Sequence, residues 1–148
     1  MRDSCRDLAD YIFLHYFYVA EIGIGRACDV GYALAEKGVK FFATDIKPLR
    51  HKGLSVVTDD ITRPDLSLYR GVDLIYSLRP PPELVFYMNR VAAKVSADLI
   101  VKPLSSEYPG GQLVTMKNSY FYLWSHGKNG KEQIQNNIRK RKDRLSGC

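Results

Sequence analysis

Cysteine is scarce in this 148-residue sequence, and the three cysteines lie far apart. Cys5, Cys28 and Cys148 include no CxxC pair, so their spacing fits neither a zinc site nor a framework of disulfide bonds. The three histidines are also isolated, without HxxxH spacing and without a cluster of acids beside them. We therefore expect reduced thiols and no metal site.

Long apolar runs are also absent. No run approaches the roughly 20 residues that cross a bilayer. The N-terminal segment, which contains Asp3, Asp7 and Asp10, lacks the charge pattern of a signal peptide. We therefore expect a cytoplasmic protein without membrane contact. Hydrophobic residues still make up 45% of the chain, with ten tyrosines and six phenylalanines, which is enough for the core of one domain.

A basic surface is absent from most of the chain, although the net charge is +6. Residues 128–148 hold seven Lys or Arg and two acids, whereas residues 1–127 hold 15 basic and 14 acidic side chains. We predict a folded domain over residues 1–126 and a basic tail over residues 127–148, either flexible or helical. The tail could contact the phosphates of a nucleic acid, or it could be a solvated chain end.

Segments typical of strands and helices alternate along most of the sequence. Strands are predicted at residues 17–22, 40–45, 54–58, 72–77 and 98–102. Helices are predicted over about three turns before Tyr16, at residues 29–37, after Pro48, at residues 65–69, and after Pro81 or Pro82. Two β-rich runs at residues 112–116 and 120–124 follow as a hairpin. The sequence therefore predicts an α/β fold in three layers, a Rossmann-like parallel sheet of about five strands with a C-terminal antiparallel hairpin.

The residues best suited to ligand binding follow the predicted strands. Open α/β sheets bind ligands beyond the carboxyl ends of their strands, at the point where the strand order reverses, which here lies beside the first strand. The candidates are Glu21, Gly23 and Gly25 after the first strand, Asp45 after the second, Asp59 and Asp60 after the third, and Ser77 and Arg79 after the fourth.

The segment Glu21-Ile-Gly-Ile-Gly25 predicts a tight turn in which backbone approaches a ligand where a Cβ would intrude. The helix beginning at Asp29 adds free N–H groups. Asp45, twenty residues beyond Gly25, is placed to accept the hydroxyl hydrogens of a ribose. The alternatives are that the glycines serve only a turn and helix packing, and that Asp45 caps a helix.

Two features favour S-adenosylmethionine over NAD as the cofactor. Glu21 lies two residues before the first glycine, and Asp59-Asp60-Ile61 falls where an adenine amino group would lie, whereas NAD requires neither. The third position of a dinucleotide motif holds Cys28 in place of Gly or Ala, which opposes close approach of a pyrophosphate. NAD is the alternative cofactor.

Residues 8–107 resemble a small uncharacterised archaeal protein family with a Rossmann-like, class I methyltransferase-like fold. The likeness is carried by the glycine segment, by Thr44-Asp45-Ile46 and Asp59-Asp60-Ile61, and by residues 73–84 and 97–107. It implies this fold and cofactor binding, without a substrate or a reaction. Amino-methyltransferases of this fold carry Asp or Asn before Pro-Pro. Here Ser77-Leu-Arg79 precedes three prolines, so their mechanism cannot be carried over.

The prolines themselves predict a rigid segment. Pro80–Pro82 should hold the backbone at Arg79 extended, with little entropy left to lose. Lys102 ends the fifth strand, which lies beside the fourth in this fold, so the two cations form a candidate site for phosphate or carboxylate. Alternatively, they cover apolar surface or pair with Glu83 and Glu107.

Three functions are compatible with these residues. The first is an S-adenosylmethionine-binding, methyltransferase-like enzyme in which the glycine turn holds the methionine portion, Asp45 the ribose, and Asp59 or Asp60 the adenine. Ser77 and Arg79 then face the substrate. The second is a non-catalytic nucleotide-binding module, and the third is an NAD-linked oxidoreductase. The predicted lid is small, so a second copy of the chain or a macromolecular substrate could complete the site.

Overall fold

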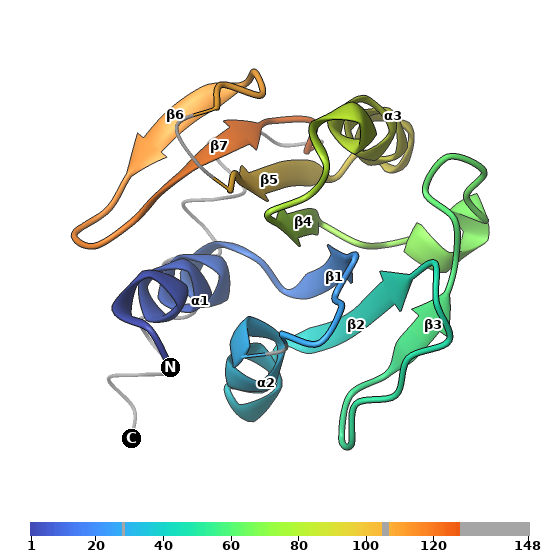
Figure 1. The fold of residues 1–148 in the computed structure, drawn as a ribbon, viewed down its shortest axis with the longest axis horizontal. Helices are drawn as coiled ribbons and strands as arrows, with labels where there is room; N and C mark the ends of the chain where they lie inside the picture. Colours follow the sequence, from blue (N-terminus) through green and yellow to red (C-terminus); the bar gives the residue numbers. More distant parts are fainter. Residues whose placement is uncertain (28, 105–106, 128–148) are drawn as a thin grey trace.

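The computed structural model describes residues 1–27, 29–104 and 107–127, so the predicted conformation of the tail lies outside the described residues. The chain forms a seven-stranded sheet in the order β3-β2-β1-β4-β5-β7-β6 (Figure 1). The strands are β1 (Tyr18–Ile22), β2 (Lys40–Asp45), β3 (Val56–Thr58), β4 (Leu74–Leu78), β5 (Asp98–Lys102), β6 (Gln112–Thr115) and β7 (Tyr120–Trp124). The helices are α1 (Asp3–His15), α2 (Asp29–Glu36) and α3 (Val85–Val95), with short 3-10 helices η1 (Leu66–Tyr69) and η2 (Pro82–Leu84).

The direction of the strands confirms the predicted fold class. β1 to β5 are all parallel. β7 then pairs antiparallel with β5, and β6 pairs antiparallel with β7, so the predicted C-terminal hairpin extends the same sheet. The result is a mixed sheet with a parallel Rossmann-like part.

Helices cover both faces of the sheet and make three layers (Figure 1). Alternating residues of β1 explain this, because Val19 packs with α1 and α2 while Ala20 packs with α3 on the other face. A strand buried on both faces is largely apolar, and β1 is apolar apart from Glu21 near its end. None of the described helices combines the length and the apolarity needed to cross a bilayer.

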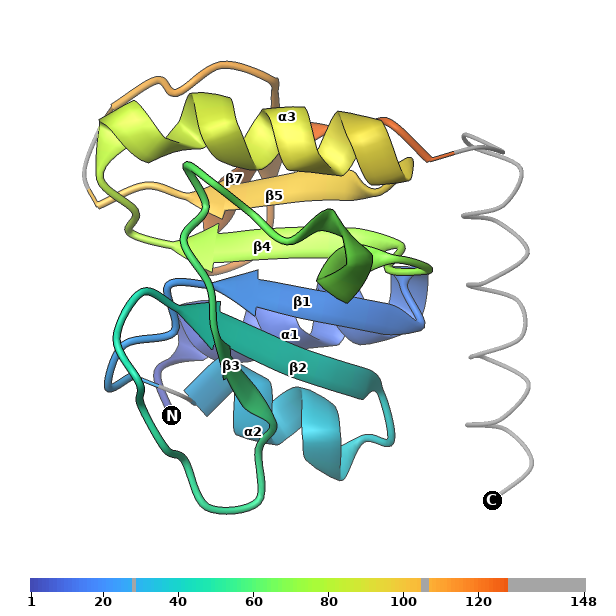
Figure 2. The same cartoon turned by 90° about the vertical axis from the view of Figure 1, so that its right-hand side faces the viewer.

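The reversal of strand order lies between β1 and β4, because β1 has β2 on one side and β4 on the other. Figure 2 shows the arrowheads of β1, β4 and β5 at one edge of the sheet. The register places Ile22 beside Thr44, and Ser77 beside Val101. The segments that follow these strands therefore meet at one edge, which is where a ligand site was predicted.

Two short helices differ from the prediction. The helix predicted after Pro48 is wrong, because the described chain between β2 and β3 is a loop containing a turn in which Leu54 N–H donates to the His51 carbonyl. The helix predicted at 65–69 forms a single 3-10 turn, with the Asp65 side chain accepting from Ser67 N–H at its start.

The amino edge of the sheet is held by two buried or half-buried aspartates. Asp73 accepts from the backbone N–H groups of Phe17 and Tyr18 at 2.9 and 2.8 Å. Asp98, which is 4% exposed, accepts from the Tyr16 hydroxyl at 2.7 Å and from the N–H groups of His126 and Gly127, each at 3.0 Å. Asp98 therefore joins the chain before β1 to the chain after β7.

Replacing Asp98 with alanine is expected to lower the free energy of unfolding by about 3 kcal/mol, since three donors, two of them backbone, lose a charged acceptor in a buried setting. Urea denaturation followed by circular dichroism measures the change. Asp10→Ala is the control, because Asp10 forms only an exposed ion pair with Lys37 at 3.4 Å and should change stability by less than about 1 kcal/mol. Equal effects of the two substitutions would contradict the anchoring role.

Candidate functional site

The glycine turn after β1 has the backbone conformation that its sequence predicts. Gly23 and Gly25 have φ values of +70° and +55°, which L side chains rarely adopt. Gly23 N–H and Ile24 N–H donate to the Thr44 carbonyl at 2.9 and 3.2 Å, which ties the turn to the end of β2. A Cβ built on Gly23 would meet no atom within 4 Å, so the space beside this backbone is open.

Asp45 lies directly against the glycine turn. Gly25 N–H donates to Asp45 Oδ2 at 2.9 Å, and Lys47 N–H donates to Oδ1 at 3.0 Å. The prediction that Gly25 and Asp45 come together at the sheet edge is therefore confirmed, and no helix follows for Asp45 to cap. Each carboxylate oxygen has two acceptor positions, so both oxygens can still accept a hydroxyl from a ligand.

His51 is a member of the site that sequence analysis missed. Its Nε2 lies 2.6 Å from the carbonyl oxygen of Gly25. A carbonyl only accepts, so this ring nitrogen carries the hydrogen. The Tyr32 hydroxyl donates to the carbonyl of Lys52, the next residue. The loop after β2 thus folds back, so His51 binds the carbonyl of the glycine whose N–H binds Asp45.

Glu21 lies beneath the sheet edge. Its side chain is 1% exposed, and the Tyr76 hydroxyl donates to Oε1 at 2.5 Å. Burial raises the pKa of Glu21 to about 8, and the hydrogen bond from Tyr76 offsets this only in part. Since Val19 and Tyr76 pack toward α1 and α2, Glu21 points into that layer.

Asp59 and Asp60 follow β3 at the same edge. Asp59 N–H donates to the Asp45 carbonyl at 3.0 Å, which brings the ends of β2 and β3 together. The Asp59 carboxylate accepts from the hydroxyl of buried Tyr69 at 3.0 Å and from Asp65 N–H at 3.1 Å. Asp60 accepts at Oδ1 from both the N–H and the hydroxyl of Thr62, and these bonds lower its pKa.

Ser77 has a different environment from the one expected of a residue that faces a substrate. It is 1% exposed, and its hydroxyl donates to the carbonyl of Ile22 at 2.8 Å. This bond joins the ends of β1 and β4 at the point where the strand order reverses. The Ser77 hydroxyl therefore stabilises the sheet edge beneath the glycine turn.

Arg79 and Lys102 are neighbours, as predicted, but their conformations differ from the expectation. Arg79 N–H donates to the Lys102 carbonyl at 2.7 Å. The expectation of extended backbone at Arg79 is wrong, because its φ is +54°, a strained value for a residue with a side chain. Lys102 Nζ donates to the Tyr120 carbonyl at 2.7 Å and lies 4.0 Å from the Tyr120 ring centroid. Burial and, to a lesser degree, nearby Arg79 lower the pKa of Lys102.

These two cations form no ion pair with Glu83 or Glu107 within the described residues, so the alternative of simple surface pairing is not observed. Arg79 is exposed. The same part of the chain contains no group of three His, Cys, Asp or Glu residues that could hold a metal ion.

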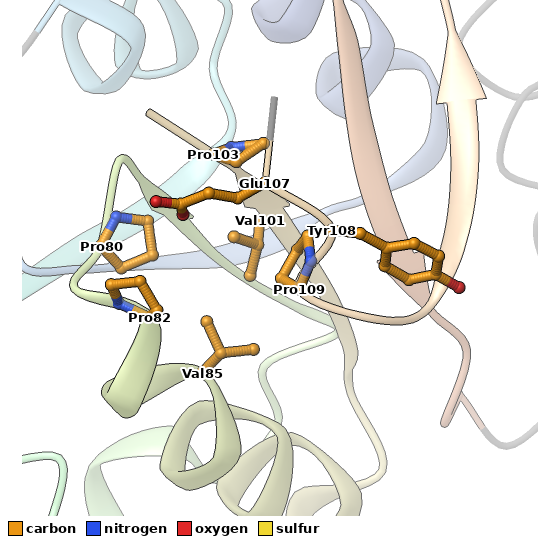
Figure 3. A pocket seen from close by; sticks show the side chains of 8 residues that line it. All are labelled: Pro80, Pro82, Val85, Val101, Pro103, Glu107, Tyr108 and Pro109. Atoms are coloured by element: carbon orange, nitrogen blue, oxygen red, sulfur yellow. The ribbon is translucent and has the colours of Figure 1, made fainter. Parts of the chain in front are cut away.

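A cavity of about 280 Å³ opens at the carboxyl ends of β4 and β5 (Figure 3). It lies beyond Arg79 and Lys102, the residues that precede two of its prolines. The lining residues are Pro80, Pro82, Val85, Val101, Pro103, Glu107, Tyr108 and Pro109. Two of the three prolines that were predicted to support Arg79, Pro80 and Pro82, thus also line a pocket.

Comparison with known families matches residues 6–126 to "Uncharacterised protein family (UPF0146)". A UPF0146 protein from Archaeoglobus fulgidus is 45% identical over 118 residues, which cover 78% of this chain and 91% of the relative. Relatives from Methanothermobacter thermautotrophicus and Pyrococcus abyssi carry the same family name.

Solved structures share the fold. TrmK from M. capricolum, solved with S-adenosyl-homocysteine, has a TM-score of 0.57 at 11% identity, and the match covers 99% of this chain and 84% of TrmK. A putative zinc-dependent alcohol dehydrogenase from Rhodobacter sphaeroides has a TM-score of 0.54 at 18% identity, and the match covers 72% of this chain and 49% of that chain. At such identities the similarity establishes a Rossmann-like fold alone. The chain belongs to the uncharacterised protein family UPF0146 and has the Rossmann-like fold of class I methyltransferases.

Proposed function

We propose that the chain binds S-adenosylmethionine at the glycine turn and acts as a methyltransferase-like protein. The observation that carries the proposal is the direct hydrogen bond between Gly25 N–H and the Asp45 carboxylate. Open backbone and a carboxylate with unused acceptor positions then face the same space at the sheet edge. This combination suits a ribose bearing two vicinal hydroxyls.

The exposed side chain of Ile46, next to Asp45, supports the proposal that an adenine ring binds at this place. Ile46 is 66% exposed, although it is large and apolar and follows a buried strand. An aromatic base lying on Ile46 would remove this surface from water. Asp59 and Asp60 follow the neighbouring strand, so a carboxylate oxygen can accept from the amino group of the base.

S-adenosylmethionine is favoured over NAD for a reason of charge. NAD carries a pyrophosphate, which needs backbone N–H groups or cations close to the turn. At this turn the Asp45 carboxylate already accepts the hydrogen bond from Gly25 N–H, so this N–H is not available to a pyrophosphate. Asp45 and Asp59 are also both acids. A cofactor with a cationic sulfonium and amino group fits this environment better than a dianionic bridge.

Calorimetric titration with S-adenosylmethionine, NAD and ATP tests the proposal. We expect micromolar binding of S-adenosylmethionine and at least about tenfold weaker binding of the other two. Stronger binding of NAD would favour an oxidoreductase, and the absence of heat with all three would overturn nucleotide binding altogether. Binding of S-adenosylmethionine without methyl transfer to any acceptor would leave the non-catalytic module as the function.

A further inference from the structure

The cavity beyond β4 and β5 has apolar walls and a single charged side chain. Four of its eight lining residues are prolines and two are valines, and Glu107 is the one charged member of this set. We propose that this pocket binds a flat, nitrogen-bearing ring whose cationic or N–H group is held by the Glu107 carboxylate. That such a ring accepts a methyl group rests on the proposed function. That the pocket binds such a ring does not.

The side chains of the walls are rigid. Proline has almost no side-chain freedom to lose, so the walls keep their shape when a ligand enters. Val101 and Val85 are 1% and 8% exposed and form the apolar floor between the prolines. A volume of about 280 Å³ lies near the lower end of the roughly 300–1,000 Å³ found for small-molecule pockets, so one ring or two fused rings would fill it.

Glu107 determines which ring is suitable. Figure 3 shows its carboxylate reaching from the loop after β5 toward Pro80, on the opposite wall. Glu107 is exposed and therefore hydrated in the free chain, so a ligand that covers its carboxylate removes this water, which costs free energy unless the ligand supplies a partner. The ligand must therefore supply a positive charge or N–H donors at this point.

The nearby cations do not alter this conclusion. Lys102 Nζ donates a hydrogen bond to the Tyr120 carbonyl and lies over the Tyr120 ring. Arg79 is exposed but does not line the cavity. Tyr108 stacks on Tyr122 at 5.3 Å between ring centroids, and Figure 3 shows its ring directed away from the cavity. An anionic ring in this pocket would meet Glu107 without a compensating charge from the walls.

Three probes of one shape test the charge requirement. Benzamidine, benzamide and benzoate share a flat ring and differ in carrying a positive, a neutral and a negative group. We expect amide-resolved NMR titration of the full chain to give a Kd for benzamidine at least about tenfold lower than for benzoate, with shifts at Val101 and Val85. Acetamidine, which lacks the ring, should bind at least about tenfold more weakly than benzamidine.

Glu107→Gln should weaken benzamidine about tenfold and leave benzamide within about twofold, since the amide retains an acceptor without the charge. Glu83→Gln is the matched control, because Glu83 is an exposed acid beside the same prolines and does not line the cavity. Equal affinity for the three probes, or unchanged benzamidine affinity in Glu107→Gln, would overturn the inference.

S-adenosylmethionine titrated into the same variants separates the two proposals. We expect Glu107→Gln to bind it as the unmodified chain does. Equal affinity of the unmodified chain for benzamidine and benzoate, with intact cofactor binding, overturns the pocket alone. Benzamidine selectivity without cofactor binding overturns the proposed function and leaves the pocket standing.

Discussion

Asp45→Ala is expected to weaken S-adenosylmethionine binding by at least about 100-fold. The proposed complex uses this carboxylate for two ribose hydroxyls, and charged hydrogen bonds contribute about 1.5–3 kcal/mol each. The substitution also removes the acceptor of Gly25 N–H and Lys47 N–H, whereas the bonds from Gly23 N–H and Ile24 N–H to the Thr44 carbonyl remain. Isothermal titration calorimetry measures the change.

Asp10→Ala serves as the control for this experiment, because Asp10 is an exposed acid on α1 whose ion pair involves only Lys37. The control should bind the cofactor as the unmodified chain does. Circular dichroism of Asp45→Ala should show that the fold is retained, since the substituted side chain lies at the sheet edge and is only half-buried. An affinity within about threefold of the unmodified chain would show that Asp45 does not contact the ligand.

Glu21 is expected to make the free energy of unfolding fall by about 3 kcal/mol between pH 5 and pH 8. Its pKa is about 8 in the folded chain against an ordinary value of 4.5, so the folded state keeps a proton that the unfolded state has released. A group with a raised pKa contributes most below the unfolded value and loses this contribution as the pH rises through the folded value. Each pH unit within this interval therefore costs up to about 1.4 kcal/mol.

Glu21→Gln should remove this slope, because glutamine is neutral at every pH and can still accept from the Tyr76 hydroxyl. Urea titrations at pH 5, 6, 7 and 8 give the comparison. His15, whose pKa burial lowers, titrates in the opposite sense, so the difference between the unmodified chain and the variant is the quantity to follow. Glu36→Gln, which changes an exposed acid on α2, should leave the slope intact. Parallel curves for the unmodified chain and Glu21→Gln would show that Glu21 is ionised when buried.

The parallel sheet could be predicted from sequence because its strands are short apolar runs with clear ends. β2 begins after Gly38 and Val39 and ends at Asp45, and β5 runs from Asp98 to Lys102, so both were predicted with their observed bounds. The connection after β2 was predicted less well. Pro48 is compatible with the first turn of a helix, but the segment from Ile46 to Leu54 closes back on the glycine turn through His51 instead.

The grouping of Gly25 and Asp45 was also predictable, since both follow neighbouring parallel strands. The contact between His51 and Gly25 was not predictable, because 26 residues separate the two and no sequence periodicity relates a loop residue to a turn. The alternation of side chains along β1 predicts that Glu21 is buried. Val19 and Glu21 occupy the same face of β1, so a buried Val19 predicts a buried Glu21.

The proline segment shows why the pocket escaped prediction. Pro80–Pro82 are adjacent in sequence, but the opposite wall comes from Pro103 and Pro109 beyond β5. The pairing of β4 with β5 brings these segments together, and the positive φ of Arg79 turns the first of them over the strand ends. The pairing was expected for this fold, but the positive φ of Arg79 was not, since a residue before proline favours extended backbone.

A crystal structure of the chain with S-adenosyl-homocysteine tests the central claim most directly. The account predicts that both ribose hydroxyls lie within hydrogen-bonding distance of the Asp45 carboxylate, with the adenine on Ile46 and the amino acid portion beside Gly23. A nucleoside bound elsewhere, or a glycine turn left without ligand at saturating concentration, would contradict it.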